Sequence, residues 1–184
     1  TVASFTPDTT NEIFQLAIQL VNQSNRNIFL TGKAGTGKTT FLKNIKNNIP
    51  KRVAIAAPTG VAALNAGGVT LHSLFQLPFG PILPIENNPL LADRKFTSEK
   101  IKTLRAIDLL IIDEISMVRA DTLDAIDQLL RRYRVRSLPF GGIQLLMIGD
   151  LNQLSPIVKD EEWALLNPYY SSMYFFESTA LKKS

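Results

Sequence analysis

Residues 32–39 are Gly-Lys-Ala-Gly-Thr-Gly-Lys-Thr, a glycine-rich segment that ends in a lysine and a hydroxyl. The segment matches the phosphate-binding pattern G-x-x-x-x-G-K-[ST] in full, with an apolar run before it and a helical pattern after it. Glycines let amide N–H groups turn toward phosphate oxygens, the lysine reaches the β- and γ-phosphates, and the hydroxyl ligates Mg²⁺. The alternative is a strand-to-helix turn that binds nothing, which the complete match disfavours. The sequence therefore predicts that ATP and Mg²⁺ bind at Gly32, Ala34, Gly35, Thr36, Gly37, Lys38, Thr39 and Thr40.

Two carboxylates, Asp113 and Glu114, directly follow the apolar run at residues 109–112. A carboxylate at the tip of a buried strand beside the phosphate-binding strand can hold Mg²⁺ through water, and Asp113 fits that part. Glu114, one residue on, can polarise the water that attacks the γ-phosphate. The alternative is a pair of solvated acids at a turn. The phosphate-binding segment upstream favours the functional interpretation, because Mg²⁺ and the γ-phosphate need groups from both segments.

A third polar segment, residues 149–153, follows the apolar run at 143–148 and ends in Gln153. Functional side chains gather at the carboxyl ends of strands in open parallel sheets. Gln153 can hydrogen-bond the γ-phosphate or the attacking water and so report whether ATP or ADP is bound. Alone, the segment fits equally well a loop in which Asp150 makes a local turn. With the other two strand ends, we predict that Lys38, Asp113 and Gln153 converge on one magnesium–triphosphate, and that Lys38, Glu114 and Gln153 form the catalytic set.

These segments need parallel strands to bring them together, and the apolar pattern predicts such strands. Continuous apolar runs alternate with amphipathic stretches, which is typical of a parallel sheet with helices on both faces. The expected strands cover residues 27–30, 53–57, 109–112, 143–148 and a short last one at 174–176. The expected helices cover 11–23, 38–48, about 97–105 and 120–134, with a short helix and a turn in 61–77 and an irregular proline-rich loop over 78–93.

The composition fits one globular α/β domain. The chain has 184 residues, of which 45% are hydrophobic, and a net charge of +4, which permits a polyanionic partner without demanding one. It has no cysteine, which excludes a disulfide framework, a zinc–thiolate site and a thiol nucleophile. No long apolar run or secretory signal is present, so we expect no membrane association and a cytoplasmic location. Because the sequence begins at Thr1 and stops at Ser184, soon after the last expected strand, we expect an excised domain.

Three segments, together with the residues above, resemble the Pif-type helicases, which are RecD-like members of helicase superfamily one. The segments are residues 57–63 (APTGVAA), 67–73 (GGVTLHS) and 113–118 (DEISMV), and the resemblance covers about residues 11–178. It implies an ATP-driven DNA helicase that moves 5′ to 3′ on single-stranded DNA. Residues 1–184 would then be one RecA-like P-loop NTPase domain, the first motor domain. The second RecA-like domain of the full-length protein, which supplies the arginines that complete the ATP site, has no counterpart in this chain.

The resemblance also implies residue roles that the pattern alone leaves open. It places single-stranded DNA along Thr59, Gly60, Thr70 and His72, and it makes Gln15 the residue that reads adenine. From the residues alone, the threonines and glycine are equally well explained as loop punctuation, His72 as a buried structural histidine and Gln15 as a surface residue of a helix.

Three further features are interpreted more simply. The Pro-rich loop 77–81 either packs beside the nucleic acid or is merely exposed. Four arginines near the end of the helix at 120–134 are explained by the helix dipole and solvation: Arg131, Arg132, Arg134 and Arg136. Ser155 stands where the family usually has the first of two prolines, which affects the expected loop shape.

Two other functions share the nucleotide chemistry. One is a stand-alone AAA-type or signalling ATPase that acts on protein partners. The other is a nucleotide-binding module that switches an interaction without turnover. Stimulation of ATP hydrolysis by single-stranded DNA separates the helicase from both.

Overall fold

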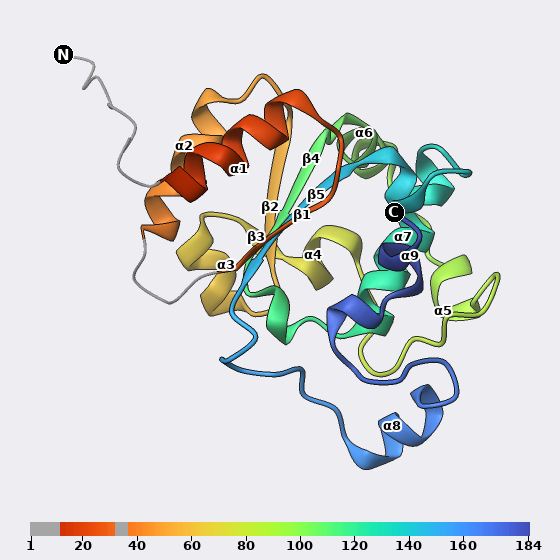
Figure 1. The fold of residues 1–184 in the computed structure, drawn as a ribbon. Helices are drawn as coiled ribbons and strands as arrows, with labels where there is room; N and C mark the ends of the chain where they lie inside the picture. The colour runs from red at the N-terminus through yellow and green to blue at the C-terminus, as the bar shows by residue number, and fades with distance from the viewer. Residues whose placement is uncertain (1–11, 32–36) are drawn as a thin grey trace.

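A five-stranded parallel sheet forms the centre of the protein, as a computed structural model shows for residues 12–31 and 37–184 (Figure 1). The strands occur in the order β1-β5-β4-β2-β3, and each neighbouring pair is parallel. Their bounds are β1 Ile28–Thr31, β2 Val53–Ala57, β3 Val69–Thr70, β4 Leu109–Ile112 and β5 Gln144–Gly149. The expected α/β fold, a parallel sheet with helices on both faces, is confirmed.

The helices account for most of the remaining described chain. The α-helices are α1 Glu12–Gln23, α2 Lys38–Asn48, α3 Gly60–Ala66, α4 Leu71–Phe75, α5 Pro89–Ala92, α6 Ser98–Ala106, α7 Ala120–Tyr133, α8 Asp160–Leu166 and α9 Thr179–Lys182. Short 3-10 helices are η1 Ile115–Met117, η2 Pro139–Gly142 and η3 Phe175–Glu177. The sequence pattern did not indicate β3, α5, α8 or α9, and where it predicted one short helix in residues 61–77 the structure has both α3 and α4.

The expected strand at 174–176 is wrong. Tyr174 makes only an isolated bridge to Arg119, and the chain turns into η3. The amides of Glu177 and Ser178 donate to the carbonyls of Tyr174 and Phe175, so these backbone groups bond within the segment instead of joining a ladder.

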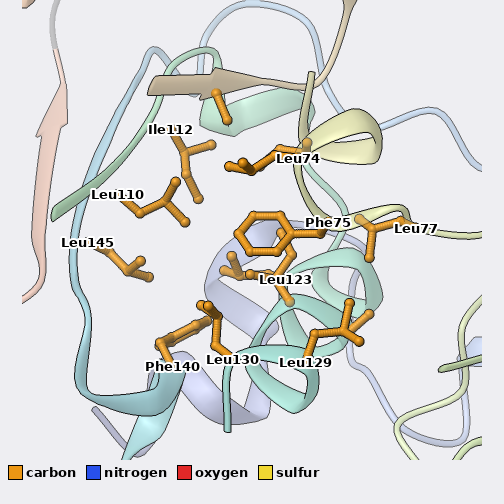
Figure 2. Close-up of a cluster of buried hydrophobic side chains, with 14 of the residues drawn as sticks. Leu74, Phe75, Leu77, Leu110, Ile112, Leu123, Leu129, Leu130, Phe140 and Leu145 are labelled. Atoms are coloured by element: carbon orange, nitrogen blue, oxygen red, sulfur yellow. The ribbon is translucent and has the colours of Figure 1, made fainter. Parts of the chain in front are cut away.

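Alternate side chains of the central strands supply two separate cores. On β4, Leu109 and Ile111 face α1 and α2, whereas Leu110 and Ile112 face α4, α6 and α7. Figure 2 shows the second of these cores, in which Leu110 and Leu145 of the sheet face Phe75 and Leu123. Because each face of β4 and β5 is covered by helices, these strands are apolar throughout, which is why the sequence pattern identified them.

Three of the four arginines near the end of α7 make specific contacts, contrary to the expectation that the helix dipole and solvation explain them, whereas Arg136 is exposed as expected. Arg131 pairs with Asp127 at 2.8 Å. Arg132 donates to the carbonyl of Ala92 at 3.0 Å, and Arg134 donates to that of Leu104 at 3.1 Å. The arginines therefore fasten α7 to neighbouring segments, because guanidinium groups can satisfy several carbonyls at once.

Among the described residues, no helix is long and apolar enough to cross a membrane.

Candidate functional site

The carboxyl ends of the parallel strands lie along one edge of the sheet and bring the predicted residues together. Register pairs Thr31 of β1 with Gly149 of β5 and Ile112 of β4 with Met147 of β5. The strand that ends at Asp113 was expected directly beside the phosphate-binding strand, but β5 lies between them. β4 instead borders β2, and the amide of Asp113 donates to the carbonyl of Ala56 at 2.9 Å.

Lys38 joins the two carboxylates at this edge. Its Nζ lies 3.1 Å from Asp113 Oδ1 and 3.1 Å from Glu114 Oε1. Lys38 is the first residue of α2, and Gly37 caps that helix in a left-handed conformation with φ +80°. Glu114 also has positive φ, +53°, and its amide donates to Asp113 Oδ1 at 2.9 Å. The sharp turn after β4 thus directs both acids toward the start of α2.

The electrostatics of this cluster keep Lys38 charged. Burial alone lowers its pKa, but the charge of Asp113 and the hydrogen bonds to Glu114 and Asp113 outweigh burial. The pKa of Lys38 therefore lies above its ordinary value. A cation held between two carboxylates can exchange them for the oxygens of a polyphosphate without changing protonation state.

The donor set at this edge fits Mg²⁺ that is shared with a nucleotide. Among the described residues, no group of three His, Asp or Glu side chains could hold a metal ion by itself. In nucleotide sites, Mg²⁺ needs only one or two protein oxygens, because water and phosphate oxygens complete its coordination. Asp113, at the carboxyl end of β4, carries oxygens of the kind that such a site uses.

Several predicted nucleotide residues lie outside the described part of the chain. These are Gly32, Ala34, Gly35 and Thr36, together with the side chain of Thr39. Thr40 is exposed in the first turn of α2.

Gln153 reaches the same edge without joining the lysine cluster. It lies in a turn after β5, in which Asp150 accepts hydrogen bonds from the amides of Asn152 at 2.9 Å and Gln153 at 3.1 Å. The local turn at Asp150 is therefore present. The Gln153 side chain is exposed and, among the described residues, has no hydrogen bond to Lys38 or Asp113.

Gln15 lies close to the start of α2. Its neighbour Phe14 stacks on Phe41 of α2 with ring centroids 4.5 Å apart. Phe14 also lies 3.6 Å from the point where a Cβ on Gly37 would stand. Gln15 is exposed on α1 and is the residue after Phe14, which packs on α2.

The predicted DNA residues lie at the other end of the same edge: Thr59 and Gly60 at the start of α3, which follows β2, Thr70 at the end of β3 and His72 in α4. Thr59 caps α3 by accepting a hydrogen bond from the amide of Ala62, and Thr70 caps α4 in the same way from Ser73. Both threonines therefore have a structural role, as helix caps, in addition to the proposed contact with DNA that the sequence left open. His72 is half-buried rather than buried, and its ring stacks on Phe79.

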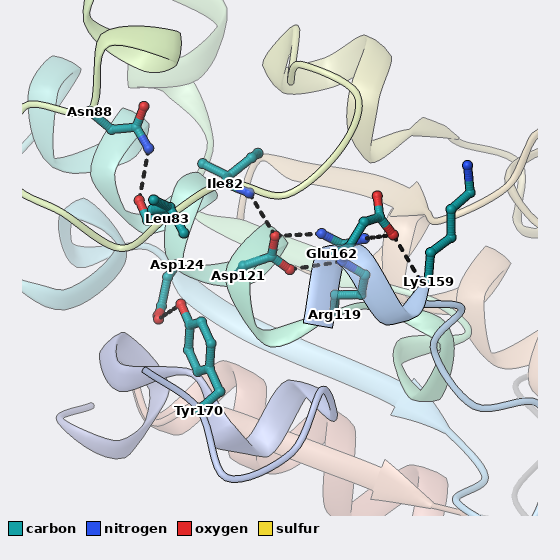
Figure 3. A network of polar contacts seen from close by, with 9 residues as sticks. All are labelled: Ile82, Leu83, Asn88, Arg119, Asp121, Asp124, Lys159, Glu162 and Tyr170. Atoms are coloured by element: carbon teal, nitrogen blue, oxygen red, sulfur yellow. Dashed lines mark hydrogen bonds and ion pairs between the residues drawn. The ribbon is translucent and has the colours of Figure 1, made fainter. Parts of the chain in front are cut away.

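A buried polar network was missed by the sequence analysis (Figure 3). Asp121 accepts hydrogen bonds from Arg119 at 2.7 Å and from the amide of Ile82 at 2.9 Å, and Arg119 also pairs with Glu162 of α8 at 3.3 Å. The network thus connects the start of α7, which follows β4, with α8, which follows β5, and with Ile82 of the proline-rich loop over 78–93. The available signal was the spacing of Asp121, Asp124 and Asp127, which puts three acids on the apolar side of α7.

The sheet order, the glycine-capped start of α2 and the Lys38–carboxylate cluster define a RecA-like P-loop NTPase fold. Within that class, the family model described as PIF1-like helicase matches residues 7–168. The chain belongs to the PIF1-like helicase family.

Individual relatives agree with this assignment. The ATP-dependent DNA helicase PIF1 of Danio rerio is 42% identical over 151 residues, which cover 82% of this chain and 23% of that protein. The ATP-dependent DNA helicase PIF1 of Homo sapiens is 39% identical over 149 residues, which cover 80% of this chain and 23% of that protein. A Bacteroides Pif1 in complex with ADP-AlF4 superposes with a TM-score of 0.88 at 48% identity, covering 95% of this chain and 40% of that one. A Bacteroides Pif1 bound to ssDNA superposes with a TM-score of 0.87 at 48% identity, covering 95% of this chain and 39% of that one. The chain thus spans less than a quarter of the length of the Danio rerio and Homo sapiens proteins.

Proposed function

We propose that the chain is the ATP-binding first motor domain of a DNA helicase, which couples ATP hydrolysis to movement on single-stranded DNA. The observation that carries the proposal is the contact of Lys38 with both Asp113 and Glu114 at the edge of a RecA-like sheet. Membership of the PIF1-like family supports it. Relatives named ATP-dependent DNA helicase, and Bacteroides Pif1 structures with ADP-AlF4 or ssDNA, are further support.

The nucleotide end would work by exchange of partners. Lys38 leaves the carboxylates for the β- and γ-phosphates, which frees Glu114 to orient the attacking water. Asp113 and the hydroxyl of Thr39 would hold Mg²⁺, which neutralises phosphate charge when bound. Gln153 would contact the γ-phosphate or the water. The backbone of the glycine-rich segment at Gly32, Ala34, Gly35, Thr36 and Gly37 would cradle the phosphates, with Thr40 and Gln15 at its margins.

The DNA end would lie along Thr59, Gly60, Thr70 and His72. Contacts from hydroxyls and backbone groups to phosphate and sugar position a strand without reading its sequence. A second RecA-like domain of the full-length protein would face the same edge and supply the arginines of the ATP site. A cytoplasmic location is part of this proposal.

The ATPase activity of the full-length protein, measured with and without single-stranded DNA, tests the proposal. We expect DNA to raise the rate many-fold. A rate that DNA leaves unchanged would contradict the helicase and favour an ATPase or a nucleotide switch that acts on protein partners.

Two substitutions separate binding from turnover. Glu114→Gln should still bind ATP but hydrolyse it about 10²-fold or more slowly, because the group that orients the water is lost. Lys38→Ala should lose ATP binding itself. Glu161→Gln and Lys46→Ala, at exposed positions away from the cluster, serve as matched controls. Normal hydrolysis by Glu114→Gln would show that another residue activates the water.

A further inference from the structure

Phe79 has the highest exposed fraction of any large apolar side chain among the described residues, 92%. Its ring stacks on the imidazole of His72, with centroids 5.4 Å apart and planes 14° apart. Because one face lies on His72 while the side chain remains so exposed, the other face is open to solvent. Exposed aromatic rings of this kind forgo the hydrophobic gain of burial unless a partner covers them.

The loop that carries Phe79 is fixed on both sides of it. Leu77 and Ile82 are buried, and the amide of Leu77 donates to the carbonyl of His72 at 3.1 Å. The amide of Ile82 donates to Asp121 at 2.9 Å (Figure 3). Between them Gly80 adopts φ +87°, which turns the chain back toward the core. The exposure of Phe79 is therefore built into the loop, since its neighbours are anchored and it alone points outward.

His72 gives Phe79 an uncharged support. Burial is the main cause that lowers the pKa of His72, and the charge of Arg119 lowers it further, against a smaller opposite effect of Asp121. The imidazole is consequently neutral near pH 7 and offers an apolar face for stacking.

Two cations contact backbone carbonyls of the segment that contains His72. Lys100 lies 3.4 Å from the carbonyl of Ser73, and Arg94 donates to the carbonyl of Gln76, both at the end of the short helix that contains His72. At its beginning, the same helix is capped by Thr70, one of the proposed DNA contacts. An open aromatic face and cations on the same short segment are the combination that binds unpaired bases and their phosphates.

We infer that Phe79, supported by His72, is a stacking platform for an unpaired base of single-stranded DNA. This inference rests on the proposed function, because it requires the strand to pass along β3 and α4. The two alternatives for the Pro-rich loop 77–81, exposure and contact with DNA, are then compatible. The ring of Phe79 is exposed in the absence of DNA, and a base covers it when DNA binds.

The experiment measures the affinity of the full-length protein for oligothymidylate by fluorescence anisotropy. Phe79→Leu, which keeps apolar bulk but removes the ring, should weaken binding by about 5- to 150-fold, the range for loss of one base–aromatic stack. Phe79→Trp should bind like the wild type. Phe176→Leu is the matched control, because Phe176 is a partly exposed phenylalanine that stacks on Tyr174 elsewhere.

A second DNA, in which abasic positions replace the bases, identifies the contact. The difference between wild type and Phe79→Leu should disappear on this DNA, because no base remains to stack. Equal loss on both DNAs would overturn base stacking, and so would unchanged affinity of Phe79→Leu for oligothymidylate. If the wild type itself failed to bind single-stranded DNA, the proposed function would be contradicted. If the wild type bound and Phe79→Leu bound equally well, only the stacking inference would be contradicted.

Discussion

The two acids that share Lys38 differ in exposure, and this difference sorts their roles. The side chain of Asp113 is 7% exposed and that of Glu114 is 26% exposed. Asp113 Oδ1 accepts a hydrogen bond from the amide of Glu114 as well as contacting Lys38, so the backbone orients this carboxylate independently of the lysine. Such fixed geometry suits a metal ligand, whereas the more exposed Glu114 can reach a water molecule.

Tyr170 offers a residue-level test of the polar network around α7. It is buried and donates a hydrogen bond to Asp124 at 2.7 Å. Burial first, and then the charge of Asp124, raises the pKa of Tyr170 above its ordinary value of 10.0. The stabilisation by the protonated phenol is therefore complete below pH 10. It is lost as the pH rises above 10, because the unfolded state then releases the proton first.

Tyr170→Phe should consequently be about 1 kcal/mol less stable than wild type at pH 8, where it lacks one hydrogen bond. Above pH 10 the wild type should lose about 1.4 kcal/mol per pH unit relative to the variant, so the order of stability reverses. Urea unfolding at pH 8, 10 and 11 measures this crossing. Tyr169→Phe, at the exposed neighbouring tyrosine, is the control. Parallel curves for wild type and Tyr170→Phe would contradict the assignment.

At the scale of elements, the turn from α3 into β3 depends on one close approach. A Cβ added to Gly68 would lie 2.2 Å from the carbonyl oxygen of Ile55 on β2. That contact is impossible without a shift of the sheet edge that carries Thr70. Gly60, at the start of α3, has no atom within 4 Å of the equivalent position.

We therefore expect Gly68→Ala to reduce the free energy of unfolding by about 2 kcal/mol or more. Gly60→Ala, the matched control, should be neutral or more stable by up to about 1 kcal/mol, because alanine favours a helix. Chemical denaturation followed by far-UV circular dichroism compares the two. Equal stabilities would show that β3 moves away from β2 without cost.

How far the elements could be predicted depended on their burial. β4 and β5 are covered on both faces, so their apolar runs identified them directly. β3 has only two residues, and its pairing with β2 is a tertiary effect that no run of residues records. The apolar residues at 174–176 resemble a strand, but packing of Phe175 into the core favours a 3-10 turn there.

The candidate site was predictable where backbone pattern and chemistry coincide. Asp113 and Glu114 directly follow β4, and Lys38 begins the helix after β1, so the parallel sheet brings the three together. The order of the strands was not predictable, since apolar runs do not say which strands are neighbours. Asp121 was missed because burial of a carboxylate contradicts the usual preference of its residue type, and Phe79 was recognised only as part of the loop 77–81 because the sequence does not show that its ring is exposed.

At the scale of the whole molecule, the strand order separates two kinds of chemistry along one edge. Residues proposed for the nucleotide lie at β1, β5 and β4, and those proposed for DNA lie at β2 and β3. β4 and β2 meet in the middle and are joined by the hydrogen bond from Asp113 to Ala56. β4 and β2 thus connect the turn that contains Glu114 with the end of the edge that is proposed for DNA.

The same arrangement predicts what this chain lacks. Among the described residues, Lys38 is the only cation in contact with Asp113 or Glu114, and no arginine approaches them. Arginines that stabilise the transferring phosphoryl group contribute about 10³- to 10⁵-fold in kcat. The isolated 184-residue chain should therefore bind ATP, measured by calorimetry, yet hydrolyse it about 10³-fold or more slowly than the full-length protein, with no stimulation by single-stranded DNA. Lys38→Ala in the isolated chain controls for specific ATP binding. Rapid, DNA-stimulated hydrolysis by the isolated chain would mean that its own residues complete the site, and the proposed second domain would then have no part in catalysis.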